Sequence, residues 1–170
     1  MINRSAQFDR TGQYRYRLDR WWNGAQPAIA LIMLNPSRAD HQRDDPTLRR
    51  CIGLAQQWQY GSLIVVNLFA YCTPFPKDLK TVGDPVGAEN DAAILQACQQ
   101  APQILLAWGN GGSLYQRDLR VLELLTPYRD RLYCLGINRT GQPRHPLYIP
   151  RQAQLHSWVG GLSQKAEILR

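Results

Sequence analysis

Four continuous runs of apolar residues divide the chain, and each run stops at a polar or glycine-rich segment. The runs are Ala28–Leu34, Leu63–Val66, Ile104–Trp108 and Leu132–Leu135. A strand covered on both faces is apolar throughout, whereas a half-exposed strand alternates apolar and polar positions. The pattern therefore predicts four central strands.

Helical patterns separate these strands. Asp45 and Pro46 suit the N-cap and first position of a helix, and an apolar stripe of helical period follows them. Further helices are predicted at about residues 88–100 and 113–125, with a short one around 152–158. Strands joined by helical crossovers run parallel, with helices on both faces. We expect an α/β fold of three α/β/α layers around a mostly parallel, four-stranded sheet.

The N-terminal part adds a further strand. Tyr14–Leu18 alternates apolar residues with Arg, and Asn23–Gly24 is a turn signal. We expect this arm to form a β-hairpin with the next strand, or an edge strand. No repeat or linker interrupts the pattern, so residues 1–170 are expected to form a single α/β domain.

Composition excludes several classes of protein. Hydrophobic residues make up 44% and charged residues 19%, which is ordinary for a globular chain and unlike a disordered tail, collagen or a coiled coil. The longest apolar run is far shorter than the roughly 20 residues that cross a bilayer. No apolar segment follows the basic start of the chain, so we expect no signal peptide, no membrane association and a cytoplasmic location.

Charge points toward an anionic partner. The formal net charge is +7, and 17 of the 20 basic residues are Arg. The planar guanidinium binds phosphate bidentately and stacks on bases. A nucleic acid or nucleotide partner is one interpretation, and a solvated basic surface is the other.

Metal and cofactor signals are weak. The four cysteines form no C-x-x-C pair, and the histidines lack metal-ligand spacing, so we expect reduced thiols, no metal and no cofactor. The acidic loop Asp40–Asp45 could hold a divalent cation through oxygen ligands. Its last residue already has a capping role, which favours the simpler interpretation.

Asparagines follow the predicted strands. Asn35, Asn67, Asn110 and Asn138 come at or just after strand ends, and ligands of α/β folds bind beyond the carboxyl ends of strands. A carboxamide offers a donor and an acceptor that match the edge of a nucleobase. Asn also tolerates the turn conformations found after strands, so both interpretations stay open.

The order of these motifs resembles the uracil-DNA glycosylase superfamily. Ile32–Ser37 is similar to its water-activating motif, and Val65–Leu68 to the strand whose terminal Asn reads the base. Leu105–Asn110 is similar to a Leu-Trp-Gly stretch, and His145–Tyr148 to a His-Pro motif before a loop that enters the minor groove. The four matches span about residues 29–148 in the family's order.

The resemblance implies a set of roles. Asn35 would position the water, and His145 would donate a hydrogen bond to the departing base. Asn35 stands where faster members have Asp, which predicts weak hydrolysis because an amide cannot accept the proton. The base would be flipped out of any duplex, with a wedge at Tyr148 or Ile149. The residues predicted to bind the base are Asn67, Ser37, Tyr71 and Trp108.

Phosphate contacts are predicted next to this site. Gly109, Asn110 and Gly111 precede a predicted helix and could cradle a phosphate with backbone N–H groups. Arg49 and Arg50, in the first turn of the helix that starts at Pro46, are further candidates, and a solvated helix face is the alternative.

A second resemblance is longer. Met33–Asp40, Asp45–Cys51, Asn67–Ala70 and Asp84–Asp91 look like the bacterial and phage family known as domain of unknown function 1643, which implies no established chemistry. The predicted partner is DNA or another ligand that contains a nucleobase. The alternatives are a non-catalytic module that binds nucleic acid or a modified base, and an enzyme of free nucleosides or nucleotides.

Overall fold

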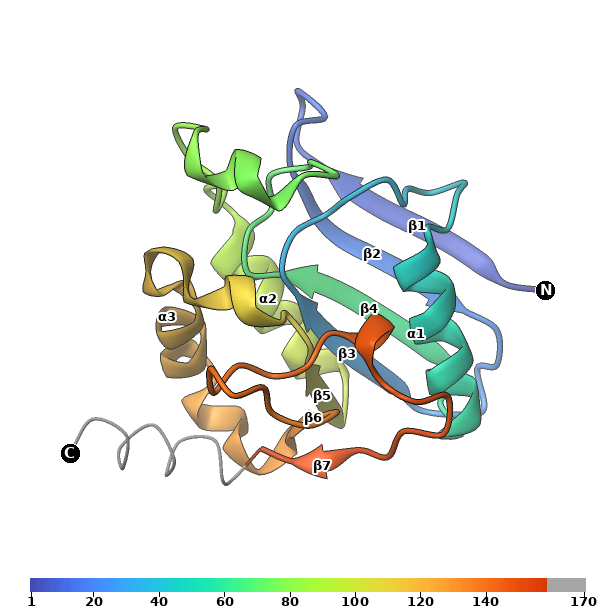
Figure 1. Cartoon of the computed structure of the whole chain (residues 1–170). Coiled ribbons are helices and arrows are strands. Elements are labelled where there is room, and N and C mark those ends of the chain that lie inside the picture. Colours follow the sequence, from blue (N-terminus) through green and yellow to red (C-terminus); the bar gives the residue numbers. More distant parts are fainter. Residues whose placement is uncertain (159–170) are drawn as a thin grey trace.

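The computed structural model describes residues 1–158, and its centre is a seven-stranded sheet in the order β1-β2-β4-β3-β5-β6-β7 (Figure 1). The inner four strands are parallel neighbours: β4 (Ser62–Asn67), β3 (Ala28–Met33), β5 (Gln103–Leu106) and β6 (Leu132–Cys134). Each of the four apolar runs forms one of these strands. The prediction of a four-stranded sheet was wrong, because three antiparallel strands extend it to a mixed sheet.

The N-terminal hairpin differs from the expected one. β1 (Asn3–Phe8) and β2 (Arg15–Trp21) form the hairpin, and β2 pairs antiparallel with β4 on its other side. It does not pair with β3, the next strand along the chain, because both edges of β3 are occupied by β4 and β5.

The C-terminal end of the described chain also differs. The short helix predicted around residues 152–158 was wrong, and β7 (His156–Ser157) pairs antiparallel with β6 there. The Trp158 N–H donates to the Leu132 carbonyl at 2.9 Å. The reason is that the open edge of β6 offers backbone hydrogen bonds, which outweigh a weak helical pattern.

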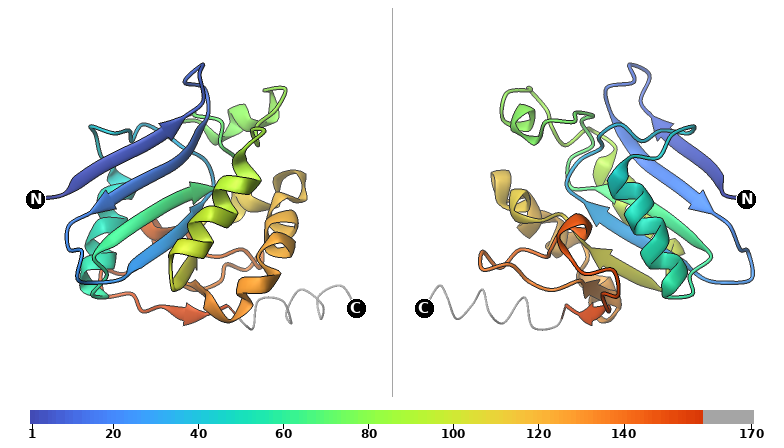
Figure 2. Two further views of the ribbon diagram at one scale, coloured as in Figure 1. Left: turned by 180° about the vertical axis from the view of Figure 1, so that it is seen from behind. Right: turned by 45° about the vertical axis from the view of Figure 1, so that its right-hand side comes forward.

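Helices cover both faces of the sheet (Figure 2). One face carries α1 (Pro46–Gln57), and the other carries α2 (Asn90–Gln100) and α3 (Arg117–Leu124). The helix predicted at residues 113–125 is interrupted: a 3₁₀ segment, η2 (Asn110–Gln116), has non-helical Leu114 and Tyr115. The backbone packs closely there, since a Cβ on Gly112 would lie 2.1 Å from the Trp108 ring.

Short 3₁₀ helices complete the connections. They are η1 (Pro76–Lys80), η3 (Thr126–Arg131) and η4 (Pro146–Tyr148). η4 lies beside α1 on the same face of the sheet (Figure 1). None of the helices in residues 1–158 is both long and apolar enough to span a membrane.

Alternation along β3 and β4 decides which side chains reach the α1 face. Leu31 and Met33 in β3, and Val65 in β4, pack with α1, while their neighbours face α2. The same two-residue period places Asn67 at the end of β4 on the α1 face, where its Cα is paired with that of Met33.

Candidate functional site

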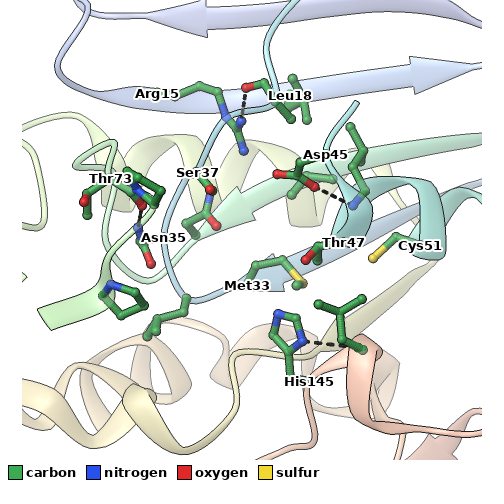
Figure 3. Close-up of a pocket in the computed structure, with 18 of the residues that line it drawn as sticks. Arg15, Leu18, Met33, Asn35, Ser37, Asp45, Thr47, Cys51, Thr73 and His145 are labelled. Carbon is green, nitrogen blue, oxygen red and sulfur yellow. Dashed lines mark hydrogen bonds between the residues drawn. The ribbon is translucent and has the colours of Figure 1, made fainter. Parts of the chain in front are cut away.

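A cavity of about 380 Å³ lies at the carboxyl ends of β3 and β4 (Figure 3). The start of α1 bounds one side, and the segment that contains His145 bounds another. Three of the predicted site residues, Asn35, Asn67 and His145, line it together, and Ser37 lines it too. The remaining lining residues are Arg15, Leu18, Met33, Leu34, Ala39, Asp45, Thr47, Leu48, Cys51, Val65, Thr73, Pro74, Pro76, Leu147 and Tyr148.

Asn67 is more deeply buried than Asn35 and His145. Its side chain is 2% exposed, and its amide nitrogen has no hydrogen-bond partner among the described residues. Its backbone carbonyl is satisfied by Asn90, which donates at 2.9 Å. A buried amide without an acceptor costs roughly 1–3 kcal/mol, so this donor is the natural anchor for a ligand oxygen.

Asn35 is fixed by its own loop. Its amide nitrogen donates to the carbonyls of Pro36 at 3.0 Å and Thr73 at 2.8 Å. Two carbonyl partners settle which end of the amide is nitrogen, because only NH₂ can donate to both. The carbonyl oxygen of Asn35 is turned away from Thr73 (Figure 3) and is the end of the side chain that can accept from a water.

His145 presents a defined nitrogen to the cavity. Its Nδ1 accepts the N–H of Leu147 at 3.2 Å, so the neutral ring carries its proton on Nε2. Burial lowers the pKa of His145 below its ordinary value, and the nearby Asp45 carboxylate opposes that shift. Neutral His145 is therefore a hydrogen-bond donor through Nε2, which points toward the cavity (Figure 3).

The N-terminus of α1 contributes the acidic part of the site. Asp45 caps the helix by accepting the Leu48 N–H through Oδ1 at 2.8 Å, and its other oxygen faces the cavity (Figure 3). Thr47 lies in the first turn. Burial raises the pKa of the Cys51 thiol to about 12, so this lining residue is an uncharged thiol and no nucleophile at neutral pH.

Arg15 is a charged lining residue that the sequence analysis missed. Its side chain enters the cavity from β2, and the residue is 4% exposed. The alternation of Tyr14–Leu18 indicated exposed arginines in a half-buried strand, and no sequence signal distinguished this one from Arg17, which pairs with Asp19.

Two of the residues predicted to bind the base, Trp108 and Tyr71, lie elsewhere. Trp108 is 1% exposed in the core, where its Nε1 donates to Gln142 at 2.7 Å. The ring of Tyr71 makes an edge contact with Tyr14 at 5.8 Å. Neither residue lines the cavity.

The residues predicted to bind phosphate also lie outside the cavity lining, and they have structural partners. Asn110 accepts hydrogen bonds from Asn138 and Thr140. Arg49 donates to the Asp44 carbonyl, and Arg50 donates to the carbonyls of residues 146, 149 and 150. Arg50 thereby ties the segment after His145 to α1. Gly109 donates its N–H to Pro143, and Gly111 packs against Leu34.

The acidic loop is organised by protein groups. Asp40 accepts the N–H groups of residues 42 and 43, Asp44 pairs with Arg20 and Arg4, and Asp45 caps α1. Arg20 is fully buried and donates to two carbonyls of this loop, those of Asp40 and Arg43. In residues 1–158 no cluster of three His, Cys, Asp or Glu side chains could hold a metal ion.

Fold and site together define an α/β protein with a cavity, lined by both polar and apolar residues, beyond the carboxyl ends of two parallel strands. A family model described as protein of unknown function (DUF1643) matches residues 15–147, and the chain belongs to this family. No curated protein and no solved structure matches the chain.

Proposed function

We propose that the cavity binds a nucleobase of DNA and that the protein hydrolyses the N-glycosidic bond of that nucleotide. The observation that carries the proposal is Asn67, whose buried amide nitrogen has no hydrogen-bond partner within residues 1–158 and which lines a cavity together with Asn35 and His145. Nucleobases carry ring carbonyl oxygens that accept from such a donor. The motif order resembling uracil-DNA glycosylases supports the same assignment.

The reaction needs a group that orients the water, a donor to the departing base and an acceptor for the proton of the water. The oxygen of a water bonds to the anomeric carbon, the carbon–nitrogen bond breaks, and its electron pair leaves with the base. Asn35 orients the water through its carbonyl oxygen, since its amide nitrogen is occupied. His145 donates from Nε2 to the base oxygen on which negative charge develops.

The proton of the water has to be accepted. Asn35 cannot accept it, and Asp45 is the only carboxylate among the lining residues. The helix cap uses Oδ1 of Asp45 and leaves Oδ2 to accept a proton, so Asp45 is the proposed general base. Because Asn35 stands where the faster glycosylases have Asp, the rate is expected to be modest.

The mouth of the cavity suits an extruded base. Tyr148 is 80% exposed and Leu147 is 46% exposed, and both line the cavity. An apolar wedge at this place could fill the gap left in a base stack. A cavity of about 380 Å³ lies within the usual range for small-molecule sites, which is about 300–1,000 Å³.

The test is a single-turnover assay with oligonucleotides that contain uracil, hypoxanthine or a mismatch. We expect abasic product from at least one substrate. Replacing Asn67 with Ala should slow it by about 10–100-fold, since a good base contact is worth about 1–3 kcal/mol. His145→Gln should slow it by about 10²–10³-fold, the effect of losing one oxyanion donor.

The matched control is Asn3→Ala, which removes an exposed Asn from the edge strand β1 and should leave the rate unchanged. Absence of product from every substrate, with normal binding of the same oligonucleotides, would reduce the protein to a base-binding module. Equal rates for the wild type and Asn67→Ala would refute the assignment of the cavity.

A further inference from the structure

Among residues 1–158, Arg15 is a buried arginine that no carboxylate pairs with. Its Nη1 donates to the Ala39 carbonyl, and its Nε is buried with no partner among the described residues. The described ion pairs involve other arginines. Burial lowers the pKa of Arg15 to about 10, so the guanidinium still carries its charge at neutral pH. The carboxylates of Asp45 and Asp40 favour this charge only from beyond ion-pair distance. A buried charge without a directly paired counter-ion is costly, which calls for an anion.

An irregularity in β2 aims this side chain at the cavity. Gln7 is paired with Arg17 and the next residue, Phe8, with Arg15, so Tyr16 is an extra residue on β2. Arg15 and Leu18 are three positions apart, and in a regular strand they would face opposite sides. Both line the cavity. Such bulges re-aim side chains and are frequent next to active sites.

Other donors surround the guanidinium. Ser37 and Thr47 line the same cavity, and α1 directs its N-terminus at it. A helix N-terminus favours negative charge through its exposed N–H groups and its dipole. Asp45 also lines the cavity, but its Oδ1 is occupied by the Leu48 N–H and it forms no ion pair with Arg15.

We propose that Arg15, with Ser37 and Thr47, forms a phosphate subsite that binds the phosphate of the nucleotide whose base lies between Asn67 and His145. Figure 3 shows Arg15 and His145 entering the cavity from opposite sides, which leaves the sugar to span the space between them. The placement of the base rests on the proposed function, whereas the phosphate subsite is inferred from the buried guanidinium of Arg15. The phosphate can belong to a free nucleoside monophosphate or to a DNA backbone.

Calorimetric binding tests this subsite with inorganic phosphate, deoxyuridine, deoxyinosine and the two 5′-monophosphates. We expect each monophosphate to bind the wild type about 10–100-fold more tightly than its nucleoside, as a desolvated charge-assisted contact implies. Arg15→Met should remove that ratio and the binding of inorganic phosphate, while nucleoside affinity stays the same. Arg15→Lys should retain part of the ratio, because it keeps the charge and loses the fork.

Arg129→Met is the matched control, since this exposed arginine precedes β6 and so lies at the amino ends of the parallel strands, away from the cavity. Circular dichroism checks folding, and Ser37→Ala provides a milder variant that should lower the ratio several-fold. If the 5′-phosphate adds nothing to wild-type affinity, or Arg15→Met and Ser37→Ala both leave the ratio intact, the subsite is refuted. Phosphate binding that depends on Arg15 without any nucleoside binding would refute the proposed function alone.

A further arm identifies the source of the phosphate. An oligonucleotide without terminal phosphates should lose affinity in Arg15→Met if the subsite binds a phosphodiester of the backbone. If only the monophosphates respond, the subsite is specific for free nucleotides.

Discussion

Asn35 cannot be exchanged for Asp without cost. Its amide nitrogen donates to two backbone carbonyls, and a carboxylate there would face both oxygens with no proton to donate. We therefore expect Asn35→Asp to destabilise the fold by about 1–3 kcal/mol, the cost of leaving buried polar groups unpaired. Urea unfolding at neutral pH measures it. Unchanged stability together with faster hydrolysis would show that this loop rearranges.

His145 links stability to pH. Because the pKa of His145 in the fold lies below its ordinary value of 6.5, the unfolded chain binds this proton more readily than the folded chain does. Stability should be unaffected by His145 above the unfolded pKa and should fall as the pH drops below it. The loss levels off below the folded pKa, where both states bind the proton.

Unfolding in urea at about pH 7.5 and about pH 5.5 isolates this contribution. The wild type should lose more stability on acidification than His145→Gln does. The other histidines are common to both proteins and cancel in the comparison. Equal losses in the two proteins would mean that the ring of His145 titrates as it does in solution.

At the residue scale, the sequence predicted site residues best where a polar side chain stands at the end of a strand or in a turn. Asn35, Asn67 and His145 follow strands or open a turn, so their positions near one rim could be predicted, and the structure places all three on one cavity. Trp108 was predicted to bind the base because it ends an apolar run, but the same run buries it in the core. Whether a strand-end aromatic points inward depends on packing that the sequence pattern does not reveal.

At the scale of elements, Asp45 at the start of α1 has two roles: it caps the helix, and it is the proposed general base. Two substitutions distinguish these roles. Asp45→Asn keeps an oxygen that can accept the Leu48 N–H, whereas Asp45→Ala removes it. We expect Asp45→Ala to lower the free energy of unfolding by about 0.5–2 kcal/mol and Asp45→Asn to lower it little. Both should slow hydrolysis, since both lose the carboxylate. Hydrolysis at the wild-type rate in Asp45→Asn would exclude Asp45 as the base.

The helix cap at Asp45 could be predicted from the sequence, whereas the bulge in β2 could not. Asp45 followed by Pro46 predicts a helix start, and α1 begins at Pro46. The extra residue in β2 arises from pairing with β1, a strand whose side chains are mostly exposed and carry no clear alternation. Arg15 was missed for this reason: its direction depends on a partner strand that the apolar pattern does not indicate.

At the scale of the whole molecule, the inner sheet was predictable and its edges were not. The inner strands bury both faces, so each leaves an apolar run in the sequence. β1 and β7 are held mainly by backbone hydrogen bonds to β2 and β6, and backbone groups are the same for every residue. The predicted layers follow from the inner strands, while the total width of the sheet follows from pairing that leaves little trace in composition.

The net charge of +7 leads us to expect that DNA binding weakens as the salt concentration rises. A protein that contacts several phosphates releases counterions on binding, and log K for duplex DNA then falls with log salt by about 0.9 for each contact. We expect a steep slope for an oligonucleotide duplex and a nearly flat one for deoxyuridine. Arg38 is exposed directly after the lining residue Ser37, so Arg38→Gln should reduce the duplex slope by about 1. Arg129→Gln, before the amino end of β6, should not. Fluorescence anisotropy across a salt series measures these slopes. A flat slope for the duplex would mean that the basic residues form a solvated surface and that the cavity serves free nucleotides, because only a polyanion couples binding to the charge of the whole protein.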